Sequence, residues 1–202
     1  MLDLDSLPAT WLNLPAYEHD FESRFAALRN TDVLKLERRQ TFHQPENESW
    51  MAYLNRDFDK AARMLDTTRP RLEKMFDDLR KRSVRLLRVR VVDRPITPYL
   101  HWELQALLVR AQCGEHIRVV GPDAVAHLEP EGAQTPEVVT LGDHVTYRIA
   151  YTDHGVLDGA DRYLDTGLTA ACTSQIHTLY STGEDLADFF AREFPRHPKP
   201  VP

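Results

Sequence analysis

Residues 84–120 read VRLLRVRVVDRPITPYLHWELQALLVRAQCGEHIRVV, and this stretch decides the fold. Near its start, Val89 and Val91 alternate with Arg88 and Arg90. This period of two is typical of a β-strand with one apolar face and one polar face. The stretch therefore opens with a predicted strand over residues 84–92.

A helix and a second strand follow in the same stretch. Thr97-Pro98 favours a helix start, because threonine can cap the first turn and proline tolerates it. Gly114 is a typical helix stop, and the apolar residues 117–120 read as the second strand. A connection of this length can join parallel strands by a right-handed crossover, so we predict a strand–helix–strand unit.

The segments on both sides extend this pattern. Before the unit, apolar spacing predicts helices over residues 17–28, 48–54, 58–65 and 69–79, with an extended segment over 33–42. After it, we predict a meander of three shorter strands and a helical stretch that breaks near 181–183. These strands cover residues 138–141, 145–151 and 162–164, and the helical stretch runs from 168 to 194.

These elements define an α/β fold with an α+β tendency. We expect a helical N-terminal part packed on a mixed sheet of about five strands, with a crossover helix and a long C-terminal helix. The predicted regions are a mainly helical segment over 1–82, an α/β domain over 83–195 and a frayed tail over 196–202. We expect all of them to form one compact unit.

Composition narrows the class of protein. The 202 residues are 42% hydrophobic, and 31 acids against 25 bases give a net charge of −6. This is the profile of a compact domain that carries no membrane span, because no apolar run approaches the roughly 18 residues that a span needs. The acidic N-terminus does not read as a secretory signal, so we expect a cytoplasmic protein. The cysteines, Cys113 and Cys172, are too few for a disulfide framework.

The net charge hides a basic centre. Residues 56–94 carry 13 bases and 7 acids, whereas the flanking segments are both acidic. The acidic flanks could pack on this centre, or the centre could be an exposed face for nucleic acid or an acidic partner. Residues 58–79 also have helix-turn-helix proportions, with 84–92 as a following wing. Because acids are interleaved with the bases and face phosphates poorly, we favour packing and do not expect direct nucleic acid binding.

A family resemblance rests on a set of residues in the central stretch. They are Arg88-Val-Arg-Val-Val92, Pro95, Tyr99, Trp102-Glu103, Gly114-Glu115 and Ile117-Arg118. With them the chain resembles an uncharacterised actinobacterial family, a domain of unknown function whose genes often lie near small helix-turn-helix regulators. The resemblance is close over residues 84–120 and looser over 135–194. It implies a regulatory neighbourhood and no known activity.

The order of the C-terminal elements also resembles one half of the phospholipase D fold, which occurs as a catalytically dead module. The active form of that half needs a histidine, a lysine two residues later and an aspartate six residues after the lysine. Only His197 has a lysine at the second position, Lys199, and the chain ends before the aspartate. We therefore expect no phosphodiester chemistry by that route.

The best site candidate lies in the central stretch. Tyr99 and Glu103 share a helix face, and Trp102 is adjacent. With Arg88, Arg90 and Arg118 from the neighbouring strands, these residues could form an acidic–aromatic pocket for a ligand or partner. The alternative, which we favour, is a buried arginine–glutamate pair that holds the helix on the sheet.

Metal and nucleophile candidates are weaker. Cys113 and His116 have a ligand-like spacing, while His144 and His154 each follow an aspartate in a turn. A zinc site needs about four converging ligands, and we favour buried thiols and solvated histidines. We expect no cofactor. Cys172 with His177, or with Asp153 and His154, could instead form a nucleophile–base set.

Three functions follow from these features. We expect first a non-enzymatic interaction or sensor protein that binds a small helix-turn-helix transcriptional regulator. The second is a hydrolase or transferase with a Cys/His or Asp/His centre in the C-terminal half. The third is direct DNA binding through residues 56–94. A homodimer is a further alternative for the protein partner.

Overall fold

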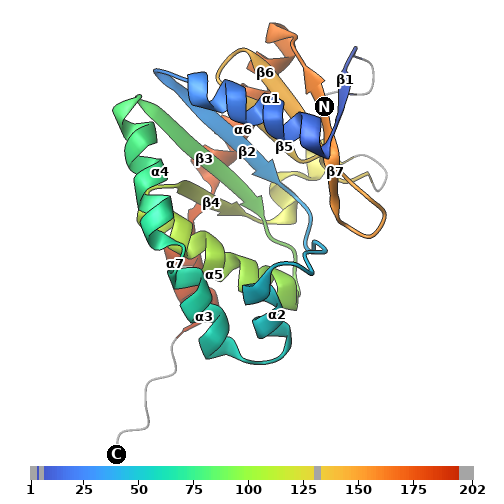
Figure 1. Ribbon diagram of the computed structural model, residues 1–202. Coiled ribbons are helices and arrows are strands. Elements are labelled where there is room, and N and C mark those ends of the chain that lie inside the picture. The colour runs from blue at the N-terminus through green and yellow to red at the C-terminus, as the bar shows by residue number, and fades with distance from the viewer. Residues whose placement is uncertain (1–3, 5–6, 130–132, 196–202) are drawn as a thin grey trace, which may run out of the picture.

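A single mixed sheet organises the fold. The computed structural model describes residues 4, 7–129 and 133–195, and in them eight strands follow the order β1-β7-β6-β5-β2-β3-β4-β8 (Figure 1). The three central strands β2 (Thr31–Glu37), β3 (Val84–Val91) and β4 (His116–Val120) are parallel. All other neighbouring strands are antiparallel. The α/β class is confirmed, and the predicted number of about five strands is too low.

The central strand–helix–strand unit is confirmed. Helix α5 (Pro98–Cys113) joins β3 to its parallel neighbour β4. The Thr97 hydroxyl accepts a hydrogen bond from the Leu100 amide at 3.0 Å, which caps the helix. Gly114 ends the helix with a φ of +126°, a backbone conformation that residues other than glycine rarely adopt.

The N-terminal half contributes both helices and strands. The predicted helices are present as α1 (Leu14–Ala27), α2 (Glu48–Leu54), α3 (Phe58–Asp66) and α4 (Arg69–Lys81). Strand β1 (Thr10–Asn13), which we did not predict, pairs with β7 at the edge of the sheet. Strands β1 and β2 belong to the same sheet as the later strands. The predicted boundary between residues 82 and 83 therefore separates strands that pair with one another.

The C-terminal half follows the predicted order. The meander consists of β5 (Val138–Leu141), β6 (Val145–Tyr151) and β7 (Leu157–Tyr163). The predicted helix break is present, because α6 (Thr166–Thr182) ends at Gly183 and is followed by β8 (Glu184–Asp185) and α7 (Leu186–Glu193). Two single turns of 3-10 helix, η1 (Pro122–Ala124) and η2 (Ala126–Leu128), lie between β4 and β5. The predicted tail 196–202 lies outside the described residues.

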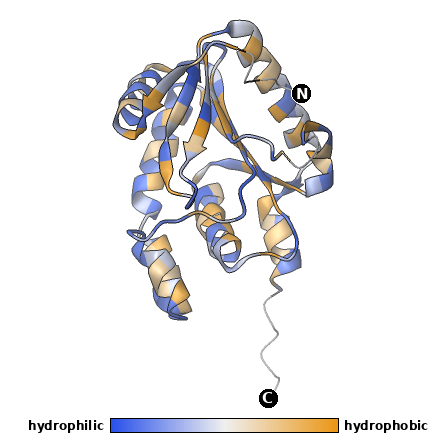
Figure 2. Cartoon of the chain, turned by 90° about the vertical axis from the view of Figure 1, so that its right-hand side faces the viewer, coloured by the Kyte–Doolittle hydropathy of each residue, from blue (hydrophilic) through white to orange (hydrophobic). Residues whose placement is uncertain are grey.

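Helices cover both faces of the sheet (Figures 1 and 2). Helix α6 packs on one face against the apolar side chains of β2 and β3, including Leu34, Val89 and Val91. Helices α1 and α4 pack on the other face around Val33 and Tyr147. Within the described ranges, no helix has the length and apolar character that crossing a bilayer requires.

Candidate functional site

Arg88 and Arg90, two of the three arginines considered for a pocket, lie on the face of β3 that α5 covers. In the parallel register, Lys35 of β2 is opposite Arg88, and Glu37 is opposite Arg90. Paired residues of parallel strands point to the same side, so these four side chains form one charged patch near the carboxyl ends of the strands. The alternating valines of β3 face α6 instead.

Arg88 is the centre of this patch. Its guanidinium donates to Glu37 at 2.5 Å and to Glu115 at 2.6 Å, and its side chain is only 8% exposed. Arg110 of α5 also donates to Glu115, and Lys35 pairs with Glu37 at 2.6 Å. We call Lys35, Glu37, Arg88, Arg110 and Glu115 the ionic cluster. Every charge in it has a partner of opposite sign.

The charges of the ionic cluster set its pKa values. Burial by itself would raise the pKa of Glu37, but Arg88 and Lys35 outweigh burial and hold that pKa well below its usual range. The same competition between burial and Arg88 and Arg110 lowers the pKa of Glu115. Both carboxyls therefore stay charged in the folded protein, as paired buried acids do.

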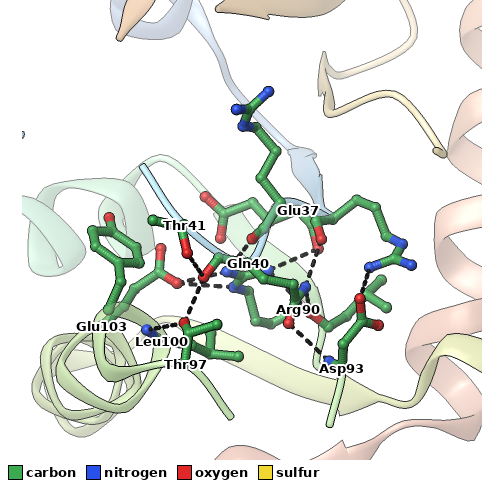
Figure 3. A network of polar contacts seen from close by, with 12 residues as sticks. Glu37, Gln40, Thr41, Arg90, Asp93, Thr97, Leu100 and Glu103 are labelled. Atoms are coloured by element: carbon green, nitrogen blue, oxygen red, sulfur yellow. Dashed lines mark hydrogen bonds and ion pairs between the residues drawn. The ribbon is translucent and has the colours of Figure 1, made fainter. Parts of the chain in front are cut away.

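Arg90 is fully buried, and its guanidinium has no donor left for a ligand (Figure 3). Two of its five N–H groups reach Glu103 Oε2, with N–O distances of 3.0 and 2.7 Å. The other three bond to the backbone carbonyls of Glu37, Arg39 and Val91. Five bonds saturate an arginine. Arg90 therefore holds α5 and the segment after β2 on the sheet, as in the structural alternative that we favoured.

Gln40 completes this junction, and the sequence offered no signal for it. Its amide donates to the carbonyls of Arg38 and Val91, and its side-chain oxygen accepts from the Asp93 amide (Figure 3). The Thr97 hydroxyl donates to the Gln40 carbonyl at 2.7 Å. The side chain and the backbone carbonyl of Gln40 thus tie together the ends of β2 and β3 and the start of α5.

Glu137, just before β5, is another buried acid that sequence reasoning missed. Its carboxylate accepts from the backbone amides of Arg38 and Arg39 and from the Tyr151 hydroxyl. Burial and the nearby Glu37 raise its pKa, and burial likewise raises the pKa of Glu103. An acid just before a strand is typical of a loop, so nothing in the sequence indicated that Glu137 is buried. The pairing of β5 with β2 brings it close to Glu37.

Tyr99 and Trp102 lie in a buried aromatic cluster with Trp50 and Phe42. The ring centroids of Trp50 lie 5.2 Å from Tyr99 and 5.5 Å from Trp102. The Trp102 indole N–H donates to the Ser49 hydroxyl at 3.0 Å. The face of α5 that we predicted to bind a ligand or partner is therefore occupied by the chain's own helix α2. Whether these residues also bind a ligand remains a prediction.

Arg118 does not join the other predicted pocket residues. It is opposite Val89 in the register of β3 and β4, so it points to the face that α6 covers. There its guanidinium lies over the Tyr180 ring at 5.6 Å and reaches Asp185 at 4.0 Å. Our grouping of Arg118 with Arg90 was wrong, because it depended on a register that the sequence does not state.

The metal and nucleophile candidates lie apart. Cys113, the last residue of α5, is buried against α4, whereas Cys172 lies on the face of α6 that packs on the sheet, in a different cluster. His116, His144 and His154 are exposed, and His144 pairs with Asp143 at 3.0 Å. In the described part of the chain, no three His, Cys, Asp or Glu side chains form a group that could hold a metal ion.

Cys172 has the wrong electrostatics for a nucleophile. Burial raises the pKa of its thiol to about 11, whereas reactive cysteines have lowered pKa values that favour the thiolate. The enzyme alternative therefore has no support from this residue, although it remains an untested prediction for the other histidines and aspartates.

The basic centre cannot include a DNA-binding wing. Residues 84–91 form the strand β3, which lies between β2 and β4 in the middle of the sheet. Arg88 and Arg90 of this segment make buried contacts, whereas the bases of α3 and α4 are exposed except for the half-buried Arg69. The acidic side chains that pair with the centre include Glu37, Glu103 and Glu115, from both flanks.

The mixed sheet, with helices on both faces and buried arginine–glutamate pairs between them, defines an α/β domain. The family described as "Domain of unknown function (DUF6879)" matches residues 19–191. The match covers most of the chain, so the protein belongs to this family. It begins at residue 19, so it also includes the N-terminal helices α2, α3 and α4, which precede the stretch that carried the resemblance. No curated protein matches the chain.

Proposed function

We propose that the protein is a non-enzymatic interaction module that binds a small transcriptional regulator. The proposal rests on the α2–α3 hairpin, residues 48–66. Five large apolar side chains of the described chain are exposed, and three of them, Met51, Leu54 and Phe58, lie within this hairpin. Clustered exposed apolar groups mark interaction surfaces, whereas scattered ones need no explanation.

The hairpin is held firmly in place. Trp50 packs on α5, and the Tyr53 hydroxyl lies 2.7 Å from Nδ1 of His101. The Tyr53 ring in turn contacts the Phe58 ring, with centroids 5.0 Å apart. A surface fixed in this way loses little conformational entropy when a partner binds, which favours affinity.

The composition of the hairpin suits a protein partner. Methionine and phenylalanine are enriched in protein interfaces, and charged residues of both signs, Arg56, Asp57 and Lys60, surround Phe58. Mixed charge is a poor match for a phosphate backbone, which attracts one sign only. The resemblance to a family encoded beside helix-turn-helix regulators supplies the candidate partner. If this protein is cytoplasmic, as we expect, it shares a compartment with such a regulator.

The test is co-expression of the tagged protein with the helix-turn-helix regulator encoded beside its gene, followed by pull-down and size-exclusion chromatography. We expect a stable complex. The double variant Leu54→Asp/Phe58→Asp should raise the dissociation constant at least tenfold, because each aspartate would place a charge in an apolar contact.

Leu164→Asp is the matched control, since Leu164 is 53% exposed but follows β7, far from the hairpin in sequence. It should bind as the wild type does. A wild-type protein that forms no complex, or a double variant that binds normally, would refute the proposal. Self-association lost in the double variant would instead make the hairpin a homodimer surface.

A further inference from the structure

A large cleft lies at the end of the molecule where β2 and β3 begin. Its volume is about 1100 Å³, and it is bordered by the end of α1, the starts of β2 and β3, the β5–β6 turn and one side of α6. Figure 1 shows the α2–α3 hairpin after the other end of β2. The residues that line the cleft include the start of that strand, so the cleft and the hairpin lie at opposite ends of β2. The cleft is slightly larger than most small-molecule sites.

The lining of the cleft is basic in a chain that is acidic overall. Three arginines line it, Arg24, Arg29 and Arg85, against two acids, Asp32 and Asp143. Two histidines, His144 and His177, add further nitrogen groups. An anion would therefore meet a favourable field here, although the net charge of the whole chain is −6.

Two of the arginines have unused capacity. Arg29 donates to the carbonyls of Ala26 and Leu28 and, among the described residues, meets no carboxylate. Arg24 shares the carboxylate of Asp20 with Arg162, so that one negative charge serves two guanidiniums. A surplus of positive charge thus remains at the end of α1.

Arg85 offers a third contact. It forms a two-bond pair with Asp32, at 2.8 and 2.6 Å, but its side chain is 63% exposed. Exposed pairs of this kind contribute little to stability, so the guanidinium can take a second anionic partner at small cost. The planar fork of arginine matches the oxygens of phosphate.

Helix α6 forms the opposite wall of the cleft with one apolar and three polar residues. Ala170, Thr173, Ser174 and His177 recur every three or four residues, so they share the face that borders the cleft. The exposed Ser174 hydroxyl and the half-buried His177 ring are therefore the polar groups of this wall that a ligand in the cleft would meet.

From this lining we infer that the cleft binds a small phosphorylated molecule. Its phosphate would lie among Arg29, Arg85 and His177, and its organic part would lie against the apolar side chains of the lining, which include Leu34, Leu141 and Val145. The inference is independent of the hairpin proposal, because it concerns another end of the molecule and a different kind of partner. Together they would describe a sensor.

Isothermal titration calorimetry of the full chain at low salt tests the inference, with inorganic phosphate, AMP, adenosine and citrate as probes. We expect AMP to bind more tightly than phosphate, and adenosine to bind at least tenfold more weakly than AMP. Equal binding of adenosine and AMP would overturn the role of the phosphate, and tighter binding of citrate would overturn the choice of phosphate over carboxylate.

The double variant Arg29→Met/Arg85→Met should weaken AMP binding at least tenfold. Arg63→Met, which removes an exposed arginine of α3 away from the cleft, should leave it unchanged. Circular dichroism shows whether each variant is folded. An absence of AMP binding at millimolar concentration, or equal binding by the folded double variant, would refute the inference.

Discussion

Strands β2 and β3 carry arginine–carboxylate pairs at both ends, and the two ends differ in burial. At the start of the strands, Arg85 and Asp32 form two hydrogen bonds, yet the Arg85 side chain is 63% exposed. Toward the carboxyl end, Arg88 pairs with Glu37 while both side chains are less than 10% exposed. The chemistry is the same, but water screens one pair and not the other.

This difference assigns different roles to similar residues. A buried charge that loses its partner is left without solvation, so the pairs of the ionic cluster must persist for the protein to fold. The exposed pair can open and close at little cost. Similar arginines three positions apart on one strand thus serve the fold at one end and remain available to a ligand at the other.

The largest expected effect comes from reversing a charge beside Arg90. In Glu103→Lys, an ammonium group would face a guanidinium that is fully buried, so we expect no folded protein. Expression yield and circular dichroism measure this. Gln105→Lys, on the half-exposed side of the same helix, is the control and should fold normally. A folded Glu103→Lys protein with normal thermal stability would contradict a structural role for the pair.

Removing the centre of the ionic cluster should have the next largest effect. Arg88→Met deprives Glu37 and Glu115 of their shared partner, and breaking such a buried pair costs about 3–5 kcal/mol. Urea unfolding followed by circular dichroism gives the free energy of unfolding. A loss below about 1 kcal/mol would mean that Lys35 and Arg110 alone can neutralise both acids.

Acid should weaken the cluster through Glu37. The folded pKa of Glu37 lies below its ordinary value of 4.5, so its contribution to stability is present above that value and is lost as the pH falls toward the folded pKa. In Glu37→Gln, the free energy of unfolding should therefore rise less steeply between pH 2 and pH 5. Urea unfolding at several pH values measures the slope, with the exposed Glu73→Gln as the control. An unchanged slope in Glu37→Gln would exclude this contribution.

The smallest effect is expected at the exposed end. Arg85→Met removes the pair with Asp32 and should lower the free energy of unfolding by less than about 1 kcal/mol. The same urea experiment compares it directly with Arg88→Met. Similar losses for the two variants would show that burial does not distinguish the two ends.

Elements with a strong local pattern could be predicted. The alternation around Val89, the Thr97-Pro98 start and the Gly114 stop correctly indicated β3, α5 and their boundaries. Strand β1 could not be found in this way, because four residues at a sheet edge carry little apolar pattern and form a strand by pairing with β7. Helix α4 begins without a side-chain cap, because the Thr68 hydroxyl donates to the Leu65 carbonyl instead.

The candidate site shows the same limit. The pairing of Arg90 with Glu103 was one of two interpretations that residue types allowed, and Glu37 and Glu137 were missed because strand register places them. The cleft escaped prediction altogether, because its lining comes from four segments that are far apart in the sequence, 24–34, 83–85, 141–145 and 170–177.

The sequence by itself determined the α/β class, the central strand–helix–strand unit and the basic centre between acidic flanks, because these depend on local periodicity and composition. Only the tertiary structure decided which arginines are buried, on which face Arg118 lies and where a basic cleft opens. These properties depend on register and packing between distant segments. The contribution of a charged side chain to the free energy of unfolding depends on its burial and on the charges packed around it, and not on its neighbours in the sequence.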